Sequence, residues 1–186
     1  MGLYVHSLGE VPSGATRNYY AYLLDYGWDE PLGEAVRKNI PQMADRASRT
    51  NATVIHGPVG VHFTDEVLSW HHINGQPADK ILPSLLITTR HPKTIRDSYR
   101  EESKGTDDAL LLVPLKKVCK NASDVAALVN QVFTDIRDEK RLKNFAVTKQ
   151  MRRGIKNAIV DAAILQPKIG GLGFDLRKFF SGILED

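Results

Sequence analysis

Cysteine is nearly absent from this chain of 186 residues, which contains a single one, Cys119. A lone cysteine excludes both a disulfide-stapled scaffold and a dithiol redox pair within the chain. Long apolar runs are missing too, since none reaches the roughly 18 to 20 residues that cross a bilayer. Residues 1–6 also lack the basic region and apolar stretch of a secretory signal. These absences predict a cytoplasmic protein without a membrane span.

Signatures of catalysis and cofactor binding are missing as well. The glycine-rich stretch Gly170–Gly173 lacks the Lys-Ser/Thr pair of a phosphate loop, and neither a nucleophile elbow nor a kinase signature occurs. His71 and His72 are adjacent, so on a helix they point about 100° apart and are poorly placed to share a metal. We therefore assign no catalytic residue, no metal site and no cofactor.

The overall composition is that of a folded chain, with 42% hydrophobic and 25% charged residues. The net charge of +3 is unevenly distributed, because residues 137–186 hold 11 Lys/Arg and 6 Asp/Glu. We therefore divide the chain into an α/β domain over residues 1–136 and a basic helical extension over residues 137–186. The basic excess is typical of a solvated helix face, and it also suits a nucleic-acid contact.

Hydrophobic periodicity gives the expected order of elements. Strands are expected over residues 3–5, 19–26, 52–57, 81–89 and 109–115. Helices are expected over residues 32–47, 64–74, 123–136, 145–165 and 176–184. Thr64 and Ser123 are the expected N-terminal caps of two helices, and Pro41 predicts a break in the first. The charged stretch Arg90–Asp108 has no apolar periodicity, so it is either a functional lid or a mobile connection.

From residue 19 to 136 this order is strand, helix, strand, helix, strand, strand, helix. Alternation implies parallel pairing with helices on both faces, and two successive strands add an antiparallel hairpin. The order resembles the thioredoxin-like fold, a mixed sheet flanked by helices. Trp28–Leu32 lies at the junction where that family has Trp-Cys-Gly-Pro-Cys, and Leu82-Pro83 opens a strand where the family keeps a cis-proline. The resemblance therefore implies a cis Leu82–Pro83 bond.

Both cysteines of the family motif are absent, and Asp29 and Leu32 occupy their places. Disulfide exchange needs a thiolate, so the resemblance implies a redox-inactive member that serves as a binding module, with Cys119 as a structural thiol. The expected partner is a protein or peptide. The implied binding surface, which Arg90–Asp108 extends, consists of Trp28, Asp29, Glu30, Pro31, Leu82 and Pro83.

Two other functions remain open. An enzyme would use Asp29 or Glu30 with a histidine as an acid/base pair at the same junction, although both acids also suit the positive end of a helix dipole. A nucleic-acid-binding protein would use the basic C-terminal segment. That segment also carries two apolar stripes, which must be covered by their own chain or by a second copy in a homodimer.

Overall fold

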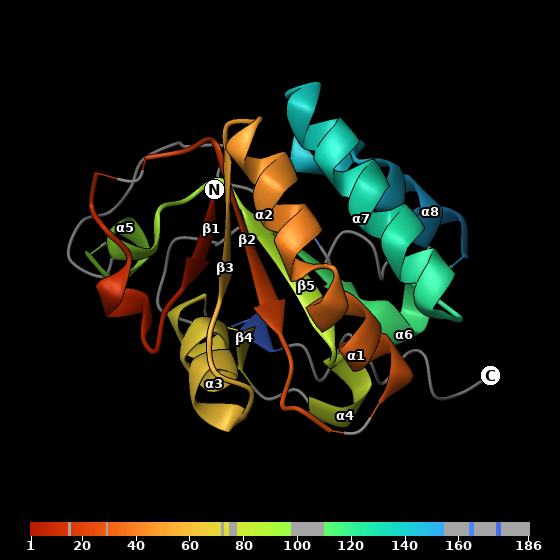
Figure 1. Cartoon of the computed structure of the whole chain (residues 1–186), viewed down its shortest axis with the longest axis horizontal. Coiled ribbons are helices and arrows are strands. Elements are labelled where there is room, and N and C mark those ends of the chain that lie inside the picture. The colour runs from red at the N-terminus through yellow and green to blue at the C-terminus, as the bar shows by residue number, and fades with distance from the viewer. Residues whose placement is uncertain are drawn as a thin grey trace.

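The computed structural model shows an α/β arrangement in which a mixed sheet has helices on both faces (Figure 1). It describes residues 1–14, 16–28, 30–71, 73–74, 78–97, 110–154, 164–165 and 174–175. The strands are β1 (Gly2–Tyr4), β2 (Tyr19–Leu24), β3 (Ala52–His56), β4 (Ile73–Asn74), β5 (Ser84–Thr88), β6 (Leu110–Pro114), β7 (Ile164–Leu165) and β8 (Phe174–Asp175). The α/β class expected from the sequence is confirmed.

Ten helical segments lie among the described residues. They are η1 (Leu8–Glu10), α1 (Pro31–Lys38), α2 (Ile40–Ser48), α3 (Val61–Trp70), α4 (Ala78–Ile81), α5 (Pro92–Asp97), α6 (Leu115–Val118), α7 (Ala122–Arg137), η2 (Leu142–Asn144) and α8 (Ala146–Gly154). Helices α1 and α2 are separated at Asn39, which confirms the break expected near Pro41. Pro31 and Pro41 each occupy the first turn of a helix, where a missing N–H is tolerated.

The sheet has the strand order β1-β3-β2-β5-β6-β7. Strands β1 and β2 run parallel to β3, whereas β5 is antiparallel to both β2 and β6. In this register Leu24 faces Ser84, and Ser84 faces Pro114. The end of β2, the start of β5 and the end of β6 therefore lie at one edge of the sheet. Because β3 is parallel to β2, its carboxyl end reaches the same edge.

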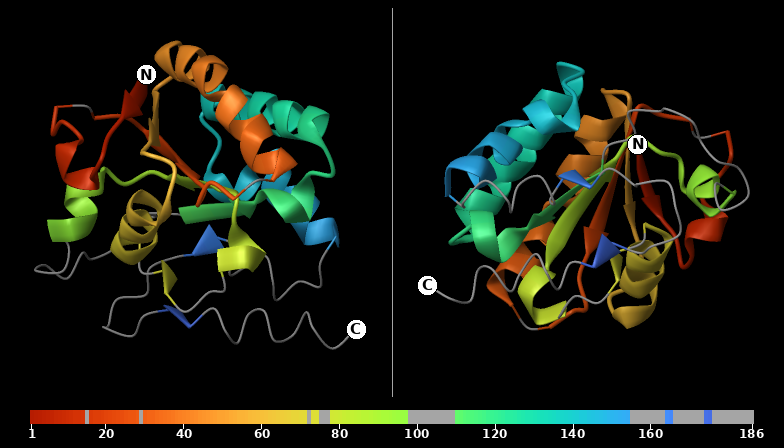
Figure 2. Two further views of the ribbon diagram at one scale, coloured as in Figure 1. Left: turned by 60° about the horizontal axis from the view of Figure 1, so that its bottom comes forward. Right: turned by 180° about the vertical axis from the view of Figure 1, so that it is seen from behind.

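Successive side chains of the strands enter two separate cores, because they point to opposite faces of the sheet. On one face, Ala21 and Leu23 of β2 pack with residues of α1, α2, α7 and α8. On the other face, Tyr20 and Tyr22 pack with residues of η1, α3 and α4. Figure 2 shows from two further directions that the sheet lies between these two groups of helices. The chain thus forms three layers.

Both expected helix caps are wrong. Asn121, and not Ser123, caps α7, because its side chain accepts a hydrogen bond from the Asp124 N–H at 3.0 Å. Thr64 lies inside α3, which begins at Val61, directly after Gly60, whose φ of 139° favours glycine. The Thr64 hydroxyl instead accepts a bond from the Asp25 N–H.

The strand expected over residues 81–89 begins later than its apolar run. Ile81 ends the short helix α4, and β5 starts only at Ser84. Ile81 and Leu82 are both 1% exposed in the core. A short apolar run alone does not distinguish a buried helix from a buried strand. The Leu82–Pro83 bond is cis, as expected. The start of Arg90–Asp108 forms α5, and residues 98–108 lie outside the described residues.

The helix expected over residues 145–165 is also wrong in its second half. Helix α8 ends at Gly154, and Ile164–Leu165 form a strand that pairs with β6. Phe145, Val147 and Met151 are at most 5% exposed and join the core formed with α1 and α2. This part of the first apolar stripe therefore packs on its own chain. The helix expected over 176–184, and with it the second stripe, lies outside the described residues.

A buried carboxylate, Asp135, joins α7 to the segment that follows it. Its side chain is 1% exposed. Its Oδ1 accepts bonds from Gln131 Nε2 at 3.2 Å and Lys140 Nζ at 2.7 Å, and its Oδ2 accepts a bond from the Ala146 N–H at 2.6 Å. The last bond satisfies an N–H that the first turn of α8 leaves free. Hydrogen bonding to Asp135 raises the pKa of Lys140. Asp135 thus fixes the turn that returns the chain to the core.

Replacing Asp135 by alanine should lower the free energy of unfolding by about 2–4 kcal/mol, because three donors lose a buried acceptor. Asp138→Ala is the matched control. Asp138 contacts the same Lys140 at 3.4 Å, but from an exposed position, so its loss should shift the urea midpoint far less. Equal shifts of the two midpoints would contradict the role given to Asp135.

Candidate functional site

The carboxyl edge of the sheet collects the connections that leave β2, β3 and β6. The first connection runs from Leu24 to α1, and the second runs from His56 to α3. Ser84 enters β5 at this edge, and β6 leaves it at Pro114 into α6. In open α/β sheets, ligands bind outside the carboxyl ends of the strands. The candidate site therefore lies among these connections.

Asp25 is the first residue after β2, and it holds the loop over residues 25–30 in place. Its carboxylate forms an ion pair with Arg37 of α1, and its Oδ1 accepts a hydrogen bond from the Gly27 N–H at 2.9 Å. Its own N–H donates to Oγ1 of Thr64 in α3 at 3.2 Å. The Asp25 side chain is only 8% exposed, so water screens these contacts weakly. One residue thus connects β2 with both neighbouring helices.

Gly27 brings this loop against the connection that follows β3. Its φ of 80° is a conformation that favours glycine. A Cβ at this position would collide with the side chain of Val59, so only hydrogen fits there. Val59 and Val61 are themselves 60% and 46% exposed. Two loops that are distant in sequence therefore form one continuous surface.

Trp28 is the largest side chain on that surface and is 41% exposed. The Tyr26 ring contacts it edge-on with centroids 5.4 Å apart, and Lys116 Nζ lies 5.9 Å from its ring centroid. The Tyr26 hydroxyl donates to Asp65 of α3. Burial, strengthened by this bond, raises the pKa of Tyr26 to about 12, so the hydroxyl remains a donor at neutral pH. The indole is thus supported on two sides while it stays accessible.

Lys116 of α6 links three elements at the rim of this surface. Its ammonium pairs with Oε1 of Glu30 at 2.8 Å and donates to the carbonyl of Asp79 at 3.1 Å. Glu30 precedes α1, and Asp79 belongs to α4. The carboxylate of Glu30 is therefore engaged as an ion-pair partner, which argues against a role as a free general base.

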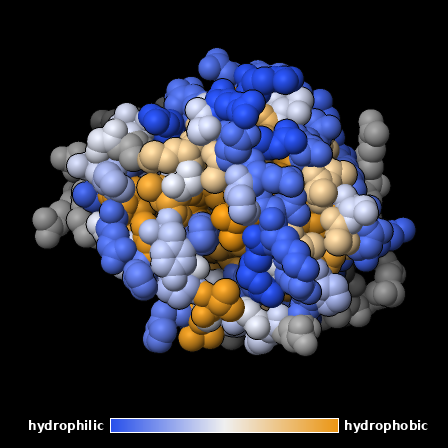
Figure 3. Space-filling view, viewed as in Figure 1, coloured by the Kyte–Doolittle hydropathy of each residue, from blue (hydrophilic) through white to orange (hydrophobic). Residues whose placement is uncertain are grey.

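We call Tyr26, Trp28, Val59 and Val61, with the Glu30–Lys116 pair beside them, the Trp28 surface. Figure 3 shows apolar surface at the lower edge of the view, where Figure 1 places the loops after β2 and β3. Helices α2 and α7 present mainly hydrophilic side chains in the same view. Single exposed valines are ordinary. What sets this region apart is a supported tryptophan on a loop whose Gly27 packs against one of these valines, Val59.

Three of the sequence-predicted site residues contribute to this region. Trp28 and Glu30 belong to the Trp28 surface, and the exposed Pro31 follows them at the start of α1. Asp29 lies outside the described residues. The strand-to-helix junction thus does reach the surface, as its sequence suggested.

Leu82 and Pro83 lie at the same edge but are buried. The Leu82 N–H donates to the carbonyl of Ala78 at 2.8 Å, and the carbonyl of Pro83 accepts a bond from the Leu115 N–H at 2.9 Å. Neither group is therefore available to a ligand strand. The binding role implied for Leu82 and Pro83 stays a prediction, and in the structure their backbone groups connect to α4 and to the start of α6.

Sequence reasoning missed four residues of the Trp28 surface: Tyr26, Val59, Val61 and Lys116. For Val59 the sequence did indicate exposure, because this residue lies between Pro58 and Gly60 in a stretch that cannot continue a strand. An apolar side chain in such a turn has little opportunity for burial. The position of Lys116 depends on how α6 packs, which periodicity does not indicate.

Cys119 is 5% exposed and belongs to the core that α7 covers. Burial, with a smaller contribution from Asp124, raises the pKa of its thiol to about 11. The thiol is therefore protonated at neutral pH, and thiolate is the species that disulfide exchange requires. These properties are those of a structural cysteine.

Comparison with protein-family models, with curated proteins and with solved structures found no match for this chain. No helix among the described residues combines the length and the apolar composition that crossing a bilayer requires. Within the same part of the chain, no three His, Cys, Asp or Glu side chains are grouped so that they could hold a metal ion.

Asp25→Ala should lower the free energy of unfolding by about 1–3 kcal/mol, because Arg37 and the Gly27 N–H lose their acceptor. Hydrogen exchange at Gly27 should also become faster. Asp45→Ala is the control, since it breaks an exposed pair with Arg49 at 3.1 Å, and it should change stability by less than about 0.5 kcal/mol. Unchanged exchange at Gly27 in the Asp25 variant would show that Asp25 does not hold the loop.

A pKa of about 11 for Cys119 predicts slow thiol chemistry in the native protein. At pH 8 the native thiol should react with Ellman's reagent at least about tenfold more slowly than the urea-unfolded thiol, and its rate should rise steadily above pH 8.

Insulin reduction with dithiothreitol in the presence of the protein should not exceed the rate without protein. Reduction above that rate that disappears in Cys119→Ser would contradict the expectation that the protein is redox-inactive.

Proposed function

We propose that the chain is a non-catalytic interaction module of thioredoxin-like type, and that its Trp28 surface binds a segment of another protein. The observation that carries this proposal is the exposed indole of Trp28, 41% accessible although Tyr26 and Lys116 hold it in place. Tryptophan and tyrosine are the side chains most enriched where interfaces concentrate their binding energy. A supported and accessible tryptophan suits that role better than it suits catalysis.

The topology supports the thioredoxin-like part of the proposal. Strands β2 and β3 are parallel, β5 and β6 are antiparallel, and α7 returns over the sheet, in the order of elements that suggested the resemblance. The two junction positions of the family's cysteines hold Asp29 and Leu32 here. We propose that the junction has kept its location and uses shape in place of thiol chemistry. The buried lone cysteine favours a reducing, cytoplasmic setting.

The surface suits a protein segment because it joins an apolar centre to a charged rim. Val59, which packs against Gly27, and Val61, two residues further on, add exposed apolar side chains, and Lys116 of the Glu30–Lys116 pair lies next to the indole. Protein interfaces have this anatomy, with apolar and aromatic residues at the centre and polar groups around them. Glu30, one of the two acids that an enzyme could use at this junction, is already paired with Lys116, and this favours a binding role over a catalytic role for Glu30.

Selection of linear peptides from a phage-displayed library against the full chain tests the proposal. Selected peptides should lose at least about tenfold in affinity on Trp28→Ala, because an aromatic anchor contributes 2 kcal/mol or more at such sites. Val59→Ser should weaken them as well, although by less. Circular dichroism and urea unfolding should show that both variants remain folded, since both side chains are exposed.

Tyr4→Ala is the matched control. Tyr4 is even more exposed, at 55%, but it belongs to β1, which β3 separates from β2. Its loss should leave affinity unchanged within about twofold. Peptides that bind Trp28→Ala as tightly as wild type, or a selection that yields no binder, would refute the Trp28 surface as the binding site.

A further inference from the structure

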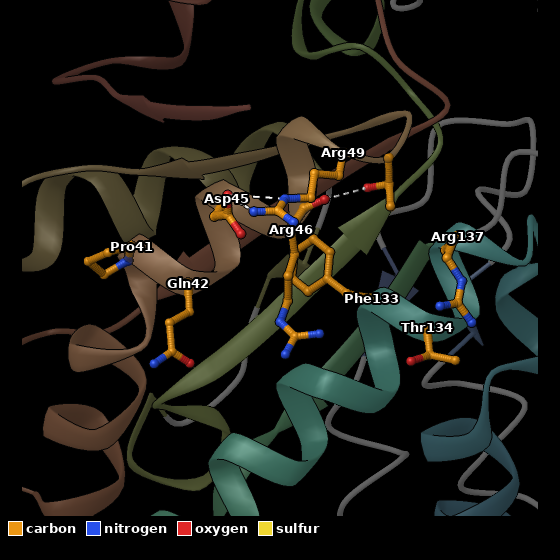
Figure 4. Close-up of a pocket in the computed structure, with 9 residues that line it drawn as sticks. Pro41, Gln42, Asp45, Arg46, Arg49, Phe133, Thr134 and Arg137 are labelled. Carbon is orange, nitrogen blue, oxygen red and sulfur yellow. Dashed lines mark hydrogen bonds and ion pairs between the residues drawn. The ribbon is translucent and has the colours of Figure 1, made fainter.

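A groove between α2 and α7 forms a second concave region, away from the Trp28 surface. Its volume is about 590 Å³, and Figure 4 shows that its walls come from both helices. Its lining residues are Pro41, Gln42, Asp45, Arg46, Arg49, Thr50, Phe133, Thr134 and Arg137. Thr50 lies two residues before β3 begins at Ala52. One part of the groove therefore lies near the amino end of β3, whereas Trp28 lies at the carboxyl edge of the sheet.

Positive charge dominates the groove, with three arginines and one aspartate in its lining. Arg49 pairs with Asp45 at 3.1 Å, and Arg137 pairs with Asp138 at 3.2 Å. Both arginines are more than two-thirds exposed, so these pairs exchange readily with water or with another anion. Arg46 differs from them: it is half-buried, and no side-chain partner for it is found in the described part of the chain.

The favourable interaction of positive charge with helix C-termini accounts for only part of the concentration of arginines in the groove. Arg46 and Arg137 lie in the last turns of α2 and α7, where positive charge stabilises a helix. That effect explains a basic residue on each helix taken separately. It does not explain why guanidinium groups from two helices line one hollow, or why, within the described part of the chain, the half-buried Arg46 forms no ion pair although Asp45 of the same groove pairs with Arg49. An unpaired guanidinium in a partly desolvated position favours an anion brought from outside.

We propose that the α2–α7 groove binds a small organic anion that carries at least two phosphate or carboxylate groups. The volume lies in the range of small-molecule sites. Guanidinium groups bind phosphate and carboxylate through two parallel hydrogen bonds, which gives geometric specificity as well as charge. Arg46 and Arg137 would each bind one anionic group from opposite walls, and the side-chain amide of Gln42 adds a neutral donor. Phe133, which is 3% exposed, forms the apolar floor.

Isothermal titration of the full chain with pyrophosphate and, separately, with citrate tests this proposal. Wild type should bind at least one probe with a Kd below about 1 mM. Arg46→Gln and Arg137→Gln should each weaken binding by at least about tenfold, because each removes one bidentate contact. Lys143→Gln is the matched control. It removes the same charge from an exposed position in η2, outside the groove, and should change Kd by less than about twofold.

The outcomes separate the possible sources of the anion. Binding of pyrophosphate alone identifies a phosphate compound, and binding of citrate alone identifies a polycarboxylate; both results support the site. The proposal is overturned if neither probe binds at about 10 mM, or if both arginine variants bind like wild type. Binding of polyglutamate without either small anion would also overturn it, because the groove would then recognise an acidic protein chain.

Discussion

The buried carboxylate of Asp25 is the constraint on which the candidate site depends. Asp25 pairs with Arg37, accepts a hydrogen bond from the Gly27 N–H and donates its own N–H to Oγ1 of Thr64. These contacts hold the start of the loop that carries Trp28, whose side chain is 41% exposed.

Two surfaces with different chemistry follow from the three-layer arrangement. The parallel pair β2 and β3 brings two loops together at one edge of the sheet, where Gly27 packs against Val59 and an apolar centre forms. Helices α2 and α7 pack on one face of the sheet, and their last turns bring Arg46 and Arg137 to a common groove. An apolar surface with a paired rim suits a protein segment, whereas a groove of guanidinium groups suits an anion.

The sequence predicted features that local chemistry determines. The order of the main strands and helices between residues 19 and 136 and the break near Pro41 follow from periodicity and proline geometry. It did not predict contacts that depend on packing between distant segments. The sequence marks Thr64 as a helix cap, but tertiary structure uses its hydroxyl to bind Asp25. Lys116 reached the site only because α6 lies against Glu30, 86 residues away in the chain.

The most direct test of the central claim measures Trp28 itself. In a Trp70→Phe variant, Trp28 is the only tryptophan, so acrylamide quenching reports on its exposure alone. We expect strong quenching in the free protein and a clear loss of quenching when a selected peptide is bound, because an interface anchor becomes desolvated. Weak quenching in the free protein, or quenching that a bound peptide leaves unchanged, would show that Trp28 is not the exposed anchor described here.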